Sequence, residues 1–508
     1  MAGKKFHNTI CMLVILSLFS ITLTGCASSG KSVPDEIYES VEDNEKIDHN
    51  NKESHNSTEN VESAEDIDNI QKLEQSEVPD IEKSKDIRTL APIEEPAHGC
   101  SPSEHNFKWE VMKDGKIVDD YIPEYEVIFA EPEFYSDVQG ITTFRGNPFR
   151  DCASYSNVEV NEESFEKVWS IKTGYIDTYT TVNQDGQPGI IKWTGVGWNG
   201  QPATVKWDEE VRNIMNIFPE KKQKDNLVEV ICAALDGKIY FLDLEDGQYT
   251  RNPIDIGFPI KGSVTLDPRG YPLLYVGQGL DENNHNKGPI GYRIYSLIDQ
   301  KELMFINGIE PFAIRKWGAF DSVALIDGKS DTLIECGENG ILYKVRLNTN
   351  FNKELGSISI SPDIVMYRYH SPMYGKVGAE NSPAIYKNYA YFADNSGILQ
   401  CVNINTLEPV WIRYVNDDTD STPVIEKESD SQVYLYTACE VDLQKNNGYS
   451  YLRKLNALNG ELLWEKKVKA SYDWYNNGGA LATPVIGKND INNLVIFNVA
   501  RTSENNDC

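Results

Sequence analysis

Short apolar runs alternate with turns rich in Asp, Asn and Gly over residues 138–508. One segment recurs there: YLRKLNALNGELLW at 451–464, ILQCVNINTLEPVW at 398–411 and IYFLDLEDG at 239–247, with weaker copies at 341–348 and 294–299. Apolar and polar positions that alternate predict strands, because successive side chains of a strand face opposite sides. Asp-Gly and Asn-Gly between such runs predict tight hairpin turns. The copies recur roughly every 50 residues, a period typical of a β-propeller blade.

A second recurring element precedes the first in each unit. It reads SPAI at 382–385 and TPVI at both 422–425 and 483–486, with degenerate copies SVAL at 322–325 and SVTL at 263–266. Each unit therefore predicts four antiparallel strands, and neighbouring units bury the faces that one sheet leaves exposed. The fold class expected is an all-β propeller of about six to eight four-stranded blades. Aromatic residues at repeat spacing are expected to pack between blades: Trp411, Trp464, Tyr240 and Tyr343.

The repeat resembles a known family. The segment 452–464 is similar to the tryptophan-docking repeat of PQQ-type β-propellers, and 399–411 and 239–247 match it in part. TFRGNPFR at 143–150 resembles the Phe-Arg-Gly-Asn segment that often opens such propellers. The resemblance covers residues 138–508 and implies a ring that commonly has eight blades. The family includes quinoprotein dehydrogenases, BamB-like envelope assembly factors and extracytoplasmic lipoproteins.

Five repeat units are clear, and a further unit is expected around 169–207. The chain stops soon after NLVIFNVA at 493–500, in the middle of a predicted blade. A propeller that lacks strands leaves open sheet edges. We therefore expect that the last blade is incomplete because the sequence is truncated at its C-terminal end.

The first 26 residues have the form of an export signal. Lys4 and Lys5 precede an apolar run, and LTGC at 23–26 has the Leu-x-Gly-Cys form of a bacterial lipoprotein signal. The alternative is an uncleaved membrane anchor, but the apolar stretch of about 14 residues is shorter than the roughly 20 that span a bilayer. The sequence predicts a signal peptide at 1–25 and lipidation of Cys26, which would anchor the protein on the extracytoplasmic face of the bacterial membrane.

Charge separates the next segment from the propeller. Residues 27–100 contain 20 Asp+Glu and 7 Lys+Arg, with only isolated large apolar residues. Such a composition cannot bury enough apolar area to form a core, so 26–100 is predicted to be a disordered acidic linker. The structure of the lead-in at 101–137 is not evident from its pattern. The whole chain has a formal net charge of −30, which argues against nucleic acid as a partner.

Candidate chemistry is sparse. The chain has no adjacent cysteines and no Cys-x-x-Cys, so the vicinal pair common in PQQ dehydrogenases and the usual zinc and haem motifs are missing. Four cysteines fall inside predicted strands, at 232, 336, 401 and 439. A bridge such as Cys100–Cys152 stays open, because pairing cannot be read from sequence. No cofactor is expected, although PQQ and calcium are not excluded.

Four segments hold the remaining candidates. His370, in YRYHSP at 367–372, is the histidine with neighbours suited to a Ser/His/Asp site. DENNHNKG at 281–288 and NDDTD at 416–420 are rich in oxygen ligands and leave calcium binding open, although neither has the spacing of an EF-hand and solvated loops are the simpler interpretation. YDWYNNGG at 472–479 is either an aromatic binding patch or blade-edge packing.

These patterns predict a non-catalytic scaffold or binding module at the cell envelope, without catalytic residues and with an unknown protein or envelope partner. A PQQ-dependent oxidoreductase and a BamB-like assembly factor are the alternatives.

Overall fold

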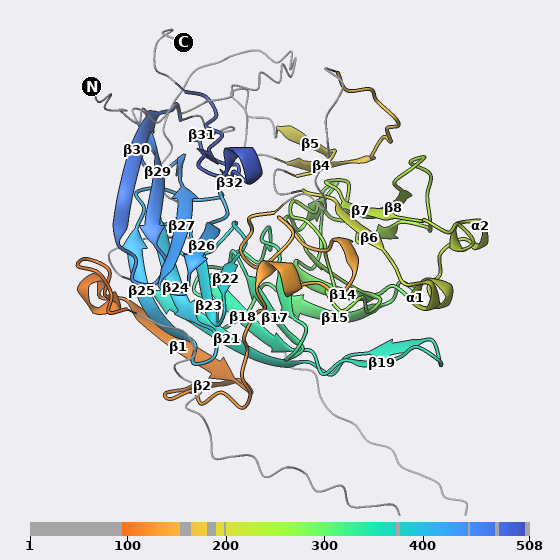
Figure 1. The fold of residues 1–508 in the computed structure, drawn as a ribbon, viewed down its shortest axis with the longest axis horizontal. Helices are drawn as coiled ribbons and strands as arrows, with labels where there is room; N and C mark the ends of the chain where they lie inside the picture. Colours follow the sequence, from red (N-terminus) through yellow and green to blue (C-terminus); the bar gives the residue numbers. More distant parts are fainter. Residues whose placement is uncertain are drawn as a thin grey trace, which may run out of the picture. The chain divides into compact units, whose positions relative to one another are not determined.

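The computed structural model describes residues 94–152, 164–179, 189–197, 200–371, 376–445, 448–472 and 477–502. The predicted signal peptide, Cys26 and nearly all of the predicted linker lie outside these residues. Antiparallel sheets dominate the described chain, and the prediction of a β-propeller with four-stranded antiparallel blades is confirmed. The sheets follow one another in chain order, as Figure 1 shows.

Blades 1 and 2 come first in the chain. Blade 1 contains β3 (Gln139–Ile141), β6 (Ala203–Lys206), β7 (Glu229–Ala233), β8 (Lys238–Asp243) and β9 (Ile254–Asp255). Blade 2 contains β10 (Thr265–Leu266), β11 (Leu273–Gly277), β14 (Gly291–Ser296) and β15 (Glu302–Asn307). In the predicted turn Asp236-Gly237, Gly237 has a φ of +78°, which lies in the region that favours glycine.

Blades 3 to 5 complete the regular part of the fold. Blade 3 contains β16 (Leu325–Asp327), β17 (Thr332–Cys336), β18 (Ile341–Arg346) and β21 (Asp363–His370). Blade 4 contains β22 (Ala384–Tyr386), β23 (Tyr389–Ala393), β24 (Ile398–Asn403) and β25 (Glu408–Tyr414). Blade 5 contains β26 (Val424–Ser429), β27 (Gln432–Ala438), β29 (Tyr449–Asn456) and β30 (Leu462–Lys469). A two-stranded sheet, β32 (Val485–Ile486) with β33 (Val495–Ile496), follows blade 5.

Small elements decorate these sheets. They are the hairpins β4 (Tyr175–Tyr179) with β5 (Ile190–Thr194), β12 (Glu282–Asn283) with β13 (Asn286–Lys287), β19 (Asn350–Asn352) with β20 (Ser357–Ser359), and the pair β28 (Glu440–Val441) with β31 (Gly478–Gly479). The helical turns are η1 (Pro102–His105), η2 (Pro132–Phe134), α1 (Glu209–Ile214), α2 (Pro219–Lys222) and η3 (Asn489–Ile491). In the part of the chain that the structure describes, no helix is both long and apolar enough to cross a membrane.

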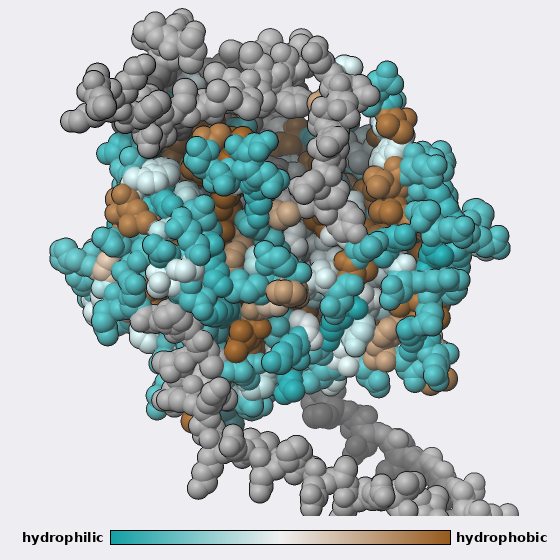
Figure 2. Space-filling view, in the orientation of Figure 1, coloured by the Kyte–Doolittle hydropathy of each residue, from teal (hydrophilic) through white to brown (hydrophobic). Residues whose placement is uncertain are grey.

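Hydrophobic clusters fill the spaces between consecutive sheets. One cluster joins blades 1 and 2, and others join blades 2 and 3, blades 3 and 4, and blades 4 and 5. A further cluster joins blade 5 to β32 and β33. Each sheet therefore buries its faces against its neighbours, as a repeat that cannot form a core alone must do. On the face shown in Figure 2, hydrophobic residues reach the surface only in small, separate groups.

Two tryptophans dock on the blade that follows them. Trp411 is fully buried, and its indole N–H donates to the backbone oxygen of Ala457 at 2.8 Å. Its ring lies against Gly460, where a Cβ would come within 2.9 Å of the ring and where φ is +77°. Trp169 donates in the same way to the backbone oxygen of Leu244 at 2.8 Å. The indole therefore joins two blades through both packing and a hydrogen bond.

The other predicted packing aromatics have different surroundings. Tyr240 is buried, and its hydroxyl donates to Asp236 at 2.5 Å. Tyr343 is buried and packs on Phe320, with ring centroids 5.5 Å apart, in the cluster between blades 2 and 3. Trp464 keeps 37% of its surface exposed and meets the edge of Phe497 at 6.2 Å.

The sequence pattern did not reveal the structure of the lead-in at 101–137. Its first part adds strands to blade 3, and its second part contacts several blades. In the first part, β1 (Lys108–Lys113) pairs with β21 and adds β2 (Lys116–Val118) to the outer edge of blade 3. Residues 119–137, the strap, then contact four blades at the end where the first and second strands turn. The contacts are Tyr125–Thr332 at 3.3 Å in blade 3, Phe129–Lys387 at 3.0 Å in blade 4, Glu131–Lys427 at 2.6 Å in blade 5 and Asp137–Pro268 at 2.8 Å in blade 2.

Residues 142–150, the axial segment, hydrogen-bond to the first strands of four blades. The pairs are Thr142–Leu266, Thr143–Ala324, Pro148–Ile385 and Phe149–Ile425, at 2.7 to 3.1 Å. Arg150 is fully buried and donates to the backbone oxygens of Val323 at 2.6 Å and Pro383 at 2.9 Å. Burial lowers the pKa of Arg150 to about 10. The Phe-Arg-Gly-Asn segment is thus a common attachment for the strands nearest the axis.

Candidate functional site: the acidic end of the propeller

Carboxylates gather at one end of blades 3 to 5, which we call the acidic end. Three of them, Asp321, Glu380 and Asp420, lie four residues before the first strand of a blade, where the chain enters the blade. Others follow the second strand, which returns to that same end in an antiparallel sheet. The acidic end consists of Asp321, Glu338, Glu380, Asp418, Asp420, Glu440 and Asp442.

The first group of carboxylates is partly balanced by cations. Single oxygens of Asp321, Glu338 and Glu380 lie within 4.8 Å of one another. The ammonium of Lys261 is 2.9 Å from Asp321, and the guanidinium of Arg315 is 3.5 Å from Glu338. Asp321 and Glu338 are buried, and each has one oxygen without a hydrogen-bond partner. Positive charge therefore reaches this group, although it does not satisfy every oxygen.

The pKa values of this group follow from burial and from mutual repulsion. Burial raises the pKa of Asp321, against the opposing effect of Lys261. Burial, with Glu380 and Asp321 as neighbours, raises the pKa of Glu338 well above its ordinary value. Burial disfavours the charged form of Lys261, but the three carboxylates outweigh it and raise its pKa. The ammonium therefore stays charged in this environment.

The second group has almost no balancing cation. Single oxygens of Asp418, Glu440 and Asp442 also lie within 4.8 Å of one another. Asp418 and Glu440 are buried, whereas Asp442 is half-buried and has an ion pair with Lys445 at 3.4 Å. One oxygen of Asp418 is buried without a hydrogen-bond partner. Glu440 accepts a hydrogen bond from the side-chain amide of Asn477 at 3.1 Å.

Burial, with repulsion from neighbouring carboxylates, raises the pKa values of Asp418 and Glu440. Burial is the main cause for Asp418, and Glu440, Glu380 and Asp442 add to it. Burial raises the pKa of Glu440 to about 8, although the hydrogen bond from Asn477 opposes the shift. These carboxyls therefore resist losing all their protons together unless a positive charge arrives, because neighbouring like charges disfavour ionisation. The acidic end is suited to bind a cation or a positively charged group.

Asp417 holds the loops of the second group in place. Its carboxylate accepts hydrogen bonds from the backbone N–H groups of Asp442, Leu443 and Gln444 at 3.1, 2.6 and 3.1 Å. The backbone oxygen of Asp418 accepts the N–H of Glu440 at 3.0 Å. Loop 416–420 and the segment 440–444 are therefore joined directly, which fixes the spacing of the carboxylates.

Of the two oxygen-rich loops seen in the sequence, only one contributes to a carboxylate cluster among the described residues. The loop 416–420 supplies Asp418 and Asp420. The other, at 281–288, contains the hairpin β12–β13, where Asp281 pairs with Lys287 at 3.8 Å and Glu282 accepts the N–H of Tyr179 at 2.8 Å. His285 stacks on Tyr179 with ring centroids 3.6 Å apart. That loop uses its polar groups to attach a neighbouring strand.

The remaining candidates lie elsewhere. His370 is exposed at the end of β21, and the hydroxyl of Ser371 donates to the backbone oxygen of His105 at 2.9 Å. In the aromatic loop 472–479, the phenol of Tyr472 contacts Lys445 at 3.2 Å, and residues 473–476 lie outside the described residues. Cys232, Cys336 and Cys401 lie in strands as predicted, but Cys439 falls between β27 and β28. Cys100 is a buried free thiol, so the bridge Cys100–Cys152 is not formed.

The sequence analysis missed the rest of the acidic end because its residues are far apart in the chain. Asp321, Glu338, Glu380 and Glu440 belong to no single motif. A signal did exist, since Asp321, Glu380 and Asp420 each stand one or two residues before a Ser or Thr of the recurring second element. An acidic residue at a fixed place in several repeats predicts a ring of charge at one end of a propeller.

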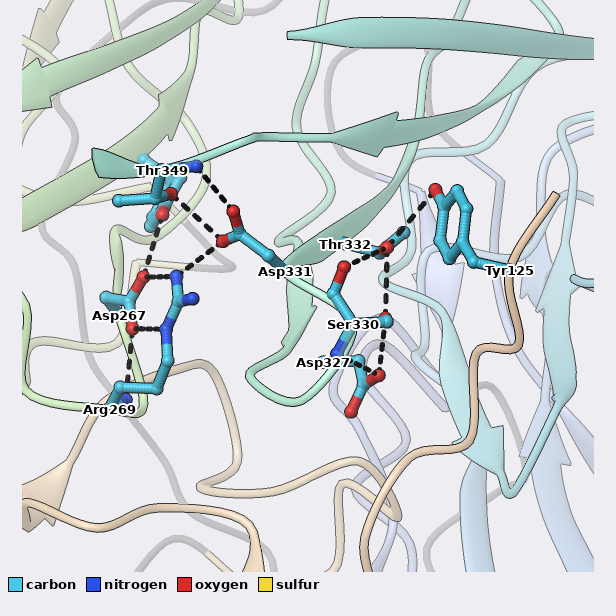
Figure 3. A network of polar contacts seen from close by, with 9 residues as sticks. Tyr125, Asp267, Arg269, Asp327, Ser330, Asp331, Thr332 and Thr349 are labelled. Atoms are coloured by element: carbon cyan, nitrogen blue, oxygen red, sulfur yellow. Dashed lines mark hydrogen bonds and ion pairs between the residues drawn. The ribbon is translucent and has the colours of Figure 1, made fainter. Parts of the chain in front are cut away.

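The opposite end carries a polar network of a structural kind, shown in Figure 3. Arg269 binds Asp267 through two hydrogen bonds, at 2.8 and 2.6 Å, and reaches Asp331 of the next blade at 2.6 Å. Thr349 donates to Asp331 through its backbone N–H and its hydroxyl, at 2.6 and 2.9 Å. Here Arg269 supplies a cation to both Asp267 and Asp331, and the network joins blades 2 and 3.

Comparisons with known proteins add little. No family model and no curated protein matches the sequence. Among solved structures, the chain is similar to BamB from Moraxella catarrhalis, with 12% identity and a TM-score of 0.29 over 50% of this chain and 64% of that one. The chain thus spans less than two thirds of that protein. It is also similar to a chain of the mitotic checkpoint complex, with 10% identity and a TM-score of 0.32 over 60% of this chain and 78% of that one. Similarities this low say nothing about function.

Proposed function

We propose that the protein is an extracytoplasmic lipoprotein, anchored through Cys26, whose propeller is a non-catalytic module that binds a positively charged partner at its acidic end. The observation that carries the proposal is the gathering of seven carboxylates from blades 3 to 5 at that end, with Lys261 and Arg315 as the cations inside the first group. Such a concentration of one charge attracts groups of the opposite charge and rejects those of the same charge.

The difference between the two ends of the propeller supports the acidic end as the binding face. At the end opposite the carboxylates of the acidic end, the strap crosses blades 2 to 5, and Arg269 pairs with Asp267 and Asp331. That end is occupied by the protein's own chain. At the acidic end, Glu380 and Asp442 are half-buried carboxylates that Lys or Arg side chains of a partner could reach.

The proposed anchor rests on sequence alone. The apolar run and LTGC at 23–26 have the order of charged, apolar and cleavage regions that a lipoprotein signal requires. The acidic segment after Cys26 would then separate the propeller from the bilayer, because like charges along a chain repel one another and extend it.

A PQQ-dependent oxidoreductase is the alternative function. The acidic end bears on it because its carboxylates are oxygen ligands that the sequence did not reveal. PQQ itself carries three carboxylates, however, and these would meet the seven carboxylates of the acidic end. Electrostatics therefore favours a cationic partner over the quinone. Titration of the full chain with PQQ in the presence of Ca²⁺ separates the two alternatives, because only the oxidoreductase requires saturable quinone binding.

The anchor is tested by Cys26→Ala in the host or in a heterologous bacterium. We expect the parent in the membrane fraction and the variant unprocessed or released from lipid, as shown by fractionation and by labelling with a radioactive fatty acid. Fatty-acid labelling of the Cys26→Ala variant at the level of the parent would contradict the proposed anchor.

The binding face is tested by photo-crosslinking on intact cells. A benzoylphenylalanine is placed at Leu443, which is 40% exposed beside Asp442, or at Phe134, which is 78% exposed on the strap. We expect an adduct from Leu443 that weakens as salt rises, because salt screens exposed charges. The same adduct from Phe134, or none from Leu443, would show that the acidic end is not the binding face.

A further inference from the structure

The side chain of Asp418 is buried beside the carboxylates of Glu440 and Asp442. Only 8% of its surface is exposed, and one oxygen of its carboxylate is buried without a hydrogen-bond partner. Its other oxygen has no protein donor among the described residues. A buried carboxylate without a donor or a cation is unfavourable by several kcal/mol, and native proteins leave few such groups without a reason. The unpartnered side chain points to a ligand that supplies positive charge.

The geometry around Asp418 fits a metal ion. Two oxygens that bind one ion at about 2.4 Å cannot be more than about 4.8 Å apart, and Ca²⁺–oxygen distances are about 2.3–2.6 Å. The oxygens of Asp418, Glu440 and Asp442 lie within 4.8 Å of one another. The three carboxylates therefore meet the spacing that ligands of a single ion require.

Hydrogen bonds within the protein already hold these carboxylates in position. Asp417 uses both of its oxygens to accept the N–H groups of residues 442–444, so Asp442 is held beside loop 416–420. The backbone oxygen of Asp418 accepts the N–H of Glu440. Asn477 donates to one oxygen of Glu440, which orients that carboxylate. Ligands held in this way lose little freedom when an ion binds.

The first carboxylate group provides a contrast within the same molecule. There Lys261 lies 2.9 Å from Asp321 and Arg315 lies 3.5 Å from Glu338, so protein cations already occupy the place of an ion. In the second group, the cation that the structure describes is Lys445, which pairs with the half-buried Asp442 at 3.4 Å and is itself largely exposed. Positive charge is thus missing where the carboxylate is most buried.

We propose that Asp418, Glu440 and Asp442 bind one Ca²⁺ ion at the acidic end of blade 5. All three ligands are carboxylates, which hard divalent cations prefer, and no His or Cys belongs to this group. Calcium tolerates irregular arrangements of six to eight oxygens, whereas Mg²⁺ demands a nearly ideal octahedron. The half-buried Asp442 leaves one side open, so water can complete the coordination and the ion can enter. The ion site would exist whether or not the acidic end binds a partner.

The proposal is tested by calorimetric titration of the full chain, purified in detergent and freed of metal, with CaCl2. We expect one saturable site with a submillimolar dissociation constant, as in extracellular calcium modules, above weak binding to the acidic segment 27–100. Asp418→Asn keeps the size of the side chain and removes one charge, and it should weaken the site at least tenfold. Asp281→Asn, in the other oxygen-rich loop, is the matched control and should leave the affinity within twofold of the parent.

Two further measurements keep the test decisive. If Asp418→Asn does not fold, as judged by circular dichroism, Asp442→Asn replaces it, because that residue is half-buried and should lower the affinity without loss of structure. Ca²⁺ should also raise the melting temperature of the parent and of Asp281→Asn but not of Asp418→Asn, since a ligand of the native state stabilises it. No saturable site in the parent, or equal affinity in all variants, would overturn the proposal. Crosslinking at Leu443 that persists in EDTA would support partner binding by itself, so the two proposals can fail separately.

Discussion

Trp411 and Trp464 occupy equivalent places at the ends of blades 4 and 5, but only Trp411 is docked. Trp411 is fully buried and donates to Ala457, whereas Trp464 is 37% exposed, and in the part of the chain that the structure describes its indole N–H has no acceptor. Replacing each with Ala makes the same chemical change in two environments. Removing a buried Trp costs about 3–5 kcal/mol, because transfer and cavity terms add. Loss of the hydrogen bond to Ala457 adds about 1 kcal/mol.

We therefore expect Trp411→Ala to lower the free energy of unfolding by about 4–6 kcal/mol. Trp464→Ala should cost about 1 kcal/mol, because its ring is partly hydrated already and fills no closed space. The assay is urea denaturation of the full chain followed by far-ultraviolet circular dichroism, which does not depend on the tryptophan removed. Trp411→Phe should lie between the parent and Trp411→Ala. Equal costs for the two alanine variants would refute the reasoning, since burial and the indole hydrogen bond would then contribute nothing.

Two further predictions concern buried charges. Burial raises the pKa of Glu335 to about 8 in the folded protein, so the folded chain keeps a proton that the unfolded chain loses, and stability falls as pH rises from about 4.5 to about 8. Glu335→Gln does not titrate, so its unfolding free energy relative to the parent should increase by up to about 1.4 kcal/mol per pH unit in this window. Urea unfolding at pH 5 and 7.5 measures this difference. The same difference between variant and parent at both pH values would contradict the prediction. Arg269→Met should lower the unfolding free energy by about 3 kcal/mol, because it leaves the buried Asp267 without its cation. Lys301→Met, at an exposed ion pair, should change the unfolding free energy far less in the same urea assay, and equal losses for the two variants would show that burial of the pair is irrelevant.

The repeat was enough to predict the fold because each blade needs the same short pattern of strands and turns, and that pattern recurs along the sequence. The repeats share alternating apolar residues and tight turns, and the fullest copies add a Trp within the last strand; these signals lie within about 50 residues of one another. Trp411 docks on Gly460 for an equally local reason, because a residue without Cβ is needed where the ring approaches the chain. The lead-in was not predictable in this way. Its strands β1 and β2 join blade 3 through pairing with β21, which is more than 200 residues away in sequence.

The acidic end was only partly visible in the sequence for a similar reason. Loop 416–420 stood out because its carboxylates are adjacent in the chain. Glu440 and Asp442 meet Asp418 only after β27 has returned to the same end of the blade. Burial decided the rest, because nothing in the composition of 281–288 distinguishes its exposed hairpin from the buried loop at 416–420. Charge at a site can be read from sequence, but the exclusion of water from it cannot.

The axial segment has a consequence for the order in which the protein is made. Arg150 emerges early in synthesis, yet two of its acceptors, on Val323 and Pro383, lie 173 and 233 residues later, and Arg145 reaches Pro484, which follows it by 339 residues. Contacts of such long range are slow to form, since the loop entropy must be lost before they contribute. The blades can pair their own strands as each emerges, but the segment that joins them waits for the later blades. The contacts of the axial segment are therefore completed only after residue 484 has been synthesised, although single blades can form earlier.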